Sequence, residues 1–199
     1  GVVGTSITYH LQKGGWKDIV LIERDELTSG STWHAAGLLP LFNMSYATSH
    51  IHDYSVKFYK KLEKELNTDI GFKVVGNLRM AQTQDRMDEF MLYSSTADTV
   101  NIPYEWKNPK QIKDRWPLVY SEDLKGAIYH PTDGYINPAD LTQAIARSAR
   151  SNDVKIERKT QADSFYWDGN SWHVQCSKMF EKGGNLLVSQ EKITYIAEQ

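Results

Sequence analysis

The stretch that decides the fold begins with Gly1-Val2-Val3-Gly4 and ends with Asp18-Ile19-Val20-Leu21-Ile22-Glu23. Between residues 2 and 13, small and apolar side chains recur at spacings of three and four, which predicts a helix. The pair Gly14-Gly15 predicts its end. The run before Glu23 is apolar almost without interruption, as a strand buried in a parallel sheet requires. A helix followed by such a strand indicates an α/β fold.

The same stretch fits the end of a dinucleotide-binding fingerprint, G-x-G-x-x-G between a strand and a helix with an acid about 20 residues on. Gly1 and Gly4 match its last two glycines and Glu23 its acid, whereas its first strand and first glycine are missing. The glycines let a pyrophosphate approach the helix N-terminus, and the carboxylate accepts from ribose hydroxyls. Alone, G-x-x-G is more typical of a tight helix–strand contact; the strand and Glu23 together reverse this and favour the nucleotide.

The charge, the cysteine count and the apolar runs of this chain argue against several classes of protein and of partner. A formal net charge of -2 over 199 residues predicts neither a nucleic-acid nor a membrane partner. The lone cysteine, Cys176, excludes an internal disulfide framework and suits a reducing compartment, a bacterial cytoplasm or a eukaryotic mitochondrial matrix. No apolar run approaches the roughly 20 residues that span a bilayer. Because position 1 is not Met, we expect an upstream piece to be absent.

The remaining pattern mixes helices with strands. Helices are expected over 44–66, 84–100, from 108 to before Pro117, and 137–151. Strands are expected over 72–81, 127–130, 154–158, 164–167 and 171–176, with a further pair around Gly183-Gly184. This order suits an α/β nucleotide-binding domain with insertions. We expect residues 1–43 to form the N-terminal part of this domain, residues 44–135 to form the insertion, and residues 136–199 to return to the first domain.

His34 is the residue most able to carry chemistry, because a neutral imidazole is a nucleophile as well as a ligand or a base. It lies in the run Gly30-Ser31-Thr32-Trp33-His34-Ala35-Ala36-Gly37, shortly after Glu23. The other histidines are assigned structural roles: His10, His50, His52, His130 and His173. None has a cysteine or an acid nearby at ligand spacing, so no metal site is expected.

The twelve residues Leu27–Leu38 resemble the covalent-flavin motif of the dimethylglycine and sarcosine dehydrogenase family, FAD-dependent amine oxidoreductases of the D-amino-acid-oxidase-like type. Ser31 and Ala35 make the motif most similar to the dimethylglycine dehydrogenase branch. The segment Asp133-Gly134-Tyr135-Ile136-Asn137-Pro138-Ala139-Asp140-Leu141 resembles the Asp-Gly-x-x-x-Pro segment of that family. The resemblance extends over nearly the whole chain and implies a Rossmann-like FAD-binding domain with an inserted antiparallel-sheet substrate domain, incomplete in this chain.

The resemblance implies a set of site residues. His34 corresponds to the histidine bonded to the flavin 8α-methyl carbon, Glu23 and Arg24 to adenosine-side residues, and Ala162 to a backbone contact with adenine. The expected cofactor site comprises Gly1, Gly4, Glu23, Arg24, Gly30, Ser31, Thr32, Trp33, His34, Ala35, Ala36, Gly37, Leu38 and Ala162. No catalytic residue is assigned. Arg79 and Arg115 are candidate anchors for a substrate carboxylate.

The resemblance also implies a function: FAD-dependent oxidative N-demethylation of a small N-methyl amino acid, dimethylglycine to sarcosine in the first instance. Tetrahydrofolate on a C-terminal region outside this chain and an electron-transfer flavoprotein are the expected partners. The alternatives are a sarcosine dehydrogenase or oxidase, and a non-catalytic relative similar to the pyruvate dehydrogenase phosphatase regulatory subunit. A simple interaction module is the third possibility.

Overall fold

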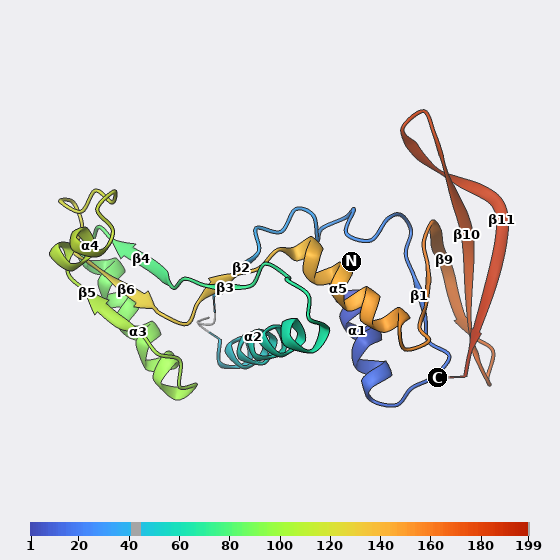
Figure 1. Cartoon of the computed structure of the whole chain (residues 1–199), viewed down its shortest axis with the longest axis horizontal. Helices are drawn as coiled ribbons and strands as arrows, with labels where there is room; N and C mark the ends of the chain where they lie inside the picture. The colour runs from blue at the N-terminus through green and yellow to red at the C-terminus, as the bar shows by residue number, and fades with distance from the viewer. Residues whose placement is uncertain (41–44, 199) are drawn as a thin grey trace. The chain divides into compact units, whose positions relative to one another are not determined.

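The computed structural model describes residues 1–40 and 45–198 (Figure 1). Two compact units make up the chain, Gly1–Ala36 with Pro138–Gln199 and, between them, Gly37–Asn137. The division into three segments stays a prediction; residue 43 and the expected helix start at Met44 lie outside the described residues. Among the residues described, no helix combines the length and the apolar character that crossing a bilayer demands.

The helices predicted from the sequence are confirmed. They are α1 (Val2–Lys13), α2 (Tyr46–Leu66), α3 (Gln84–Thr99), α4 (Pro109–Arg115) and α5 (Pro138–Arg150). Helix α4 shows why so short a helix can be recognised. Asn108 accepts from the Gln111 backbone N–H at 2.9 Å, and the Gln111 side chain accepts from the Asn108 N–H at 2.9 Å. This reciprocal capping box, with proline at the first helical position, satisfies donors that would otherwise lack partners.

The first unit contains a parallel pair of strands, β1 (Val20–Ile22) beside β8 (Lys155–Glu157), as the expected α/β fold requires. Helix α1 packs on β1 through Gly4, where an added Cβ would lie 3.1 Å from Leu21 Cδ1. A larger side chain would hold the helix away from the strand. Helices α1 and α5 pack side by side in this unit (Figure 1). The face of α5 that is buried carries Leu141, Thr142, Ala144, Ile145, Ala146 and Ala149.

An antiparallel meander completes this unit, with β10 (Trp172–Lys182) between β9 (Thr160–Trp167) and β11 (Asn185–Ala197) (Figure 1). The turn at Asp168 is the predicted hairpin, and Asp168 Oδ1 accepts from the backbone N–H groups of Asn170 and Ser171, each at 2.7 Å. The predicted strand pair around Gly183-Gly184 is confirmed, since β10 and β11 turn there, but its first strand is not separate from the one expected over 171–176. Strand β10 instead continues through Cys176 to Lys182 and pairs with both neighbours.

The second unit contains two small antiparallel sheets, ordered β2-β7-β3 and β4-β6-β5. Their strands are β2 (Leu38–Leu39), β3 (Lys73–Val74), β4 (Asn77–Ala81), β5 (Glu105–Lys107), β6 (Gly126–His130) and β7 (Gly134–Tyr135). The expected strand 72–81 is therefore divided in two. Gly76 makes the break, with a φ of 79° and no room for a Cβ beside the Tyr129 ring.

The core of the second unit encloses one histidine. His130 ends β6, is 0% exposed, and its Nδ1 lies 3.3 Å from the Pro103 carbonyl oxygen. Burial, together with the Arg79 charge, lowers the pKa of His130 to about 4. The imidazole is therefore neutral inside the folded protein at physiological pH. This agrees with the structural role assigned to it from the sequence.

The buried imidazole predicts acid sensitivity. Below its ordinary pKa of about 6.5, the unfolded chain binds a proton that folded His130 does not accept until about pH 4. The free energy of unfolding should therefore fall as the pH falls through this range. Between pH 7 and 4.5, the wild-type full-length protein should lose about 2 kcal/mol more than His130→Gln in urea unfolding. His10→Gln, at an exposed histidine, should behave like wild type; equal slopes for all three proteins would contradict the prediction.

Candidate cofactor site

A cavity of about 390 Å³ lies at the carboxyl end of β1, where α1 begins. Ligands of open α/β sheets bind at this end of the strands. Its lining residues are Gly1, Val2, Val3, Gly4, Glu23, Arg24, Asp25, Ser29, Gly30, Ser31, Thr32 and Ala35. The cavity thus joins the first turn of α1, the end of β1 and the loop that carries His34. Most of the residues predicted from the sequence meet here.

The N-terminus of α1 forms one wall. The first N–H groups of a helix have no carbonyl one turn earlier to bond, and they attract negative charge. The buried Thr32 satisfies one of them, because its Oγ1 accepts from the Val2 N–H at 3.0 Å. Gly1 leaves room for this bond, since an added Cβ would lie 2.7 Å from Thr32 Oγ1. Val3 and Gly4, the next residues of this turn, also line the cavity, and N–H groups at the start of a helix can bind a pyrophosphate.

Glu23 lines the same cavity, and the chain that follows holds its carboxylate. Its Oε1 accepts from the Asp25 N–H at 3.1 Å. Its backbone N–H donates to the Glu157 carbonyl at 2.8 Å, which extends the pairing of β1 with β8. Each carboxylate oxygen has a further lone pair to offer. The side chain can therefore accept from a vicinal diol while keeping these bonds.

The loop between Leu27 and Ala36 is coiled tightly by its own backbone. Trp33 N–H donates to the carbonyls of Thr28 and Gly30, each at 3.1 Å, and His34 N–H donates to that of Ser31 at 3.2 Å. The buried Leu27 anchors the start of the loop. The His34 ring is exposed, and its Nδ1 lies 3.1 Å from the Gly30 carbonyl oxygen. Because that oxygen can only accept, Nδ1 is the donor in this contact.

Several residues predicted from the sequence lie outside the cavity lining. Trp33, His34 and Ala36 share the loop but do not line the cavity, and the Trp33 side chain is exposed. Ala162 is exposed on β9, opposite Cys176. Gly37 and Leu38 belong to the second unit. The structure therefore brings together the predicted residues of the α1 start, the end of β1 and part of the loop, but not Ala162.

Lining residues that the sequence analysis missed are Val2, Val3, Asp25 and Ser29. Asp25 had a usable signal, because a second acid two residues after Glu23 returns to the same side of an extended chain. Val2 and Val3 contribute through backbone at a helix start, which leaves no signature in the side chain.

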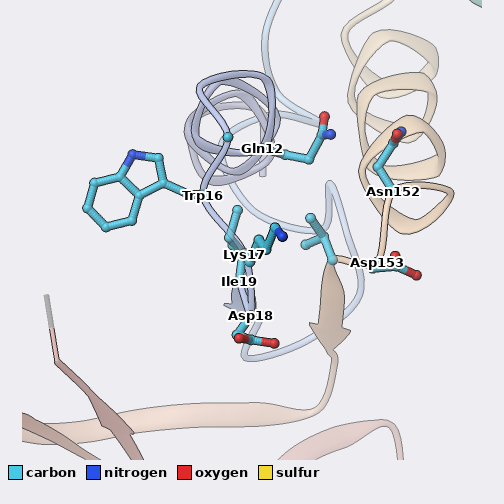
Figure 2. A pocket seen from close by; sticks show the side chains of 9 residues that line it. Gln12, Trp16, Lys17, Asp18, Ile19, Asn152 and Asp153 are labelled. Atoms are coloured by element: carbon cyan, nitrogen blue, oxygen red, sulfur yellow. The ribbon is translucent and has the colours of Figure 1, made fainter.

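A larger cavity, of about 440 Å³, lies at the other end of β1. Figure 2 shows Gln12 from α1 and Asn152 from the turn after α5 on opposite sides of it, with Asp18 at the start of β1. It touches the amino end of the strand, away from Glu23 and the helix N-terminus. It therefore lacks the features that recognise a dinucleotide, and we assign the cofactor to the smaller cavity.

The two candidate arginines lie in the second unit. Arg115 donates to the Tyr129 hydroxyl at 2.9 Å, and its guanidinium lies over the Trp116 and Tyr129 rings. Arg79 is half-buried on β4, where its charge acts on His130. Arg115 is thus engaged in packing α4 on β6. Within residues 1–40 and 45–198, no group of three or more His, Cys, Asp or Glu side chains is placed to hold a metal ion.

Comparison with known proteins places this geometry in a family. The chain is 40% identical over 158 residues to mitochondrial dimethylglycine dehydrogenase of Rattus norvegicus, covering 79% of this chain and 18% of the relative. It is 39% identical over 160 residues to the mitochondrial pyruvate dehydrogenase phosphatase regulatory subunit of Mus musculus, covering 80% and 18%. The chain therefore spans less than a fifth of these relatives.

The fold and the family model agree with these similarities. The crystal structure of L-proline dehydrogenase from P. horikoshii superposes with a TM-score of 0.82 at 23% identity, covering 94% of this chain and 48% of that one. That likeness confirms the expected fold class. The family model DAO: FAD dependent oxidoreductase matches residues 1–186. The resemblance seen in the sequence is confirmed, and the chain belongs to the family of FAD-dependent oxidoreductases.

Proposed function

We propose that the full-length protein is an FAD-dependent enzyme that oxidatively demethylates a small N-methyl amino acid, converting dimethylglycine to sarcosine. The family supports the cofactor, and the similarity to the rat dehydrogenase supports the substrate. The observation that carries the proposal is His34. Its ring is exposed, its Nδ1 lies 3.1 Å from the Gly30 carbonyl oxygen, and it shares a loop with residues that line the cavity.

The residues around the cavity fit the adenosine and pyrophosphate of FAD. The first turn of α1 offers N–H groups to the pyrophosphate, and Glu23 accepts from the ribose hydroxyls. Gly30 is open to solvent on its Cβ side, so a ligand can approach its backbone closely. Arg24, Ser31 and Ala35 line the same cavity. In this proposal, Trp33, Ala36, Gly37 and Leu38 continue along the flavin, and the Ala162 backbone contacts adenine.

Covalent attachment through His34 is proposed because Leu27–Leu38 resemble the covalent-flavin motif. When Nδ1 donates to the Gly30 carbonyl, Nε2 is the ring nitrogen left with a lone pair. We assign Nε2 as the atom that bonds the flavin 8α-methyl carbon. Bound FAD then supplies the acceptor for the electrons that leave the amine. Tetrahydrofolate, an electron-transfer flavoprotein and, in a eukaryote, a mitochondrial matrix location complete the proposal.

Two alternatives remain in the same family. Sarcosine as substrate would need the same cofactor site and a different pocket. A regulatory role is supported by the mouse relative, whose identity of 39% is close to the 40% of the rat dehydrogenase. We favour the enzyme because the chain retains both His34 and Glu23, which a regulatory surface does not require.

His34→Ala tests the attachment. Wild-type full-length protein, produced with FAD and precipitated by acid, should keep its flavin in the pellet, because a carbon–nitrogen bond survives denaturation. In His34→Ala, the flavin should pass to the supernatant and be measured there by absorbance. His10→Ala, at an exposed histidine of α1, should retain the flavin. Flavin that stays with His34→Ala would overturn the assignment, and a colourless wild type would favour the regulatory relative.

Glu23→Ala tests the ribose contact. In the His34→Ala protein, FAD binding is reversible and can be titrated by fluorescence. Loss of a charge-assisted hydrogen bond should weaken binding by roughly 1.5 to 3 kcal/mol. Glu191→Ala, on the exposed side of β11, should bind FAD like its parent. An unchanged dissociation constant for Glu23→Ala would show that the carboxylate does not touch the cofactor.

A further inference from the structure

Lys159 lies behind the proposed adenosine site and contacts one of its walls. Its Nζ donates to Asp25 Oδ1 at 2.6 Å and to Glu181 Oε1 at 2.6 Å, and it lies 3.8 Å from Glu26 Oε1. The Lys159 side chain is 26% exposed and that of Asp25 34%. Asp25 lines the cavity, whereas Lys159 does not. The cation therefore approaches the carboxylate from the side away from the cavity.

The bond to Asp25 continues directly to Glu23. The Asp25 N–H donates to Glu23 Oε1 at 3.1 Å, and the Thr160 N–H donates to the Glu23 carbonyl at 3.0 Å. Lys159 precedes Thr160 at the turn between β8 and β9, where its φ of 52° directs the chain around the corner. The turn thus holds the segment Glu23–Asp25, here called the Glu23–Asp25 corner, both by a backbone hydrogen bond and by the Lys159 side chain. Residues 134 positions apart in the sequence act as one unit.

The charges explain why this corner needs a cation. Two carboxylates, Glu23 and Asp25, line a cavity proposed to receive a pyrophosphate. The Lys159 ammonium lowers the pKa of Asp25 below its usual value, so that this carboxylate is ionised and paired. Without Lys159, the negative charge of Asp25 would face the phosphates uncompensated. Arg158 is the nearest other cation in the turn, and it pairs with Glu26.

We propose that Lys159 is a positioning residue for the cofactor: it neutralises Asp25 and keeps Glu23 turned toward the adenosine ribose. The inference rests on the proposed FAD site and adds to it a residue that does not touch FAD. A simple structural staple between the corner and Glu181 of β10 is the competing explanation. The two explanations predict different results for Asp25→Asn. This substitution removes the charge that Lys159 would neutralise, whereas the need for a structural staple would remain.

The test uses the flavin-free full-length protein in the His34→Ala background, titrated with FAD and separately with ADP, which carries only the adenosine half. Lys159→Met should raise both dissociation constants roughly 5- to 20-fold, as expected for one uncompensated charge near the site. Lys159→Arg should restore binding to within about twofold, because it keeps the cation. Lys155→Met, which removes an exposed lysine of β8 paired with Glu157, serves as the matched control and should leave both constants unchanged.

The decisive variant is the double substitution Lys159→Met with Asp25→Asn. If Lys159 acts by neutralising Asp25, this protein should recover most of the lost affinity for FAD and ADP, although the bridge itself is absent. Unchanged binding in Lys159→Met, or a loss that Asp25→Asn does not restore, would overturn the inference. Failure of the parent protein to bind FAD at all would instead overturn the proposed function. Thermal unfolding of each variant identifies a loss that arises from misfolding.

Discussion

The close approach of α1 to β1 is the constraint on which the rest of the site depends. Gly4 permits it, because a Cβ at this position would lie 3.1 Å from Leu21 Cδ1. The approach brings the positive end of the helix and the acid that ends the strand to the same edge of the parallel pair. An anion at the helix end and a diol at the acid can then be bound together. A bulkier residue at position 4 would separate these two groups.

The loop after β1 adds, at this edge of the parallel pair, the residues proposed to contact the flavin. Thr32 closes on the first turn of α1 through the Val2 N–H, and this bond fixes the loop against the helix. Gly30 then orients the imidazole of His34 two residues further on from Thr32. One short segment therefore serves as a helix cap, a cavity wall and a holder for a nucleophile. Because these roles fall on one short segment, the segment is highly informative about the candidate site.

The sequence predicted those features that depend on neighbouring residues. Periodicity and caps located the helices of the described residues, and the glycines with Glu23 pointed to the edge where the structure has a cavity. The short strands β2, β5 and β7 were missed, because two or three residues have no period and exist only through pairing with distant partners. The same reason hid the Lys159–Asp25 contact, which joins positions 134 residues apart. Ala162 was placed by family resemblance alone, and its expected contact with adenine stays a prediction.

The measurement that tests the account most directly is a crystal structure of the full-length protein with its flavin bound. The account predicts electron density joining His34 Nε2 to the flavin 8α-methyl carbon. It also predicts the ribose hydroxyls within hydrogen-bonding distance of Glu23, and the pyrophosphate against the first turn of α1. A flavin ring attached elsewhere, or an adenosine that leaves Glu23 and the start of α1 without contacts, would contradict it.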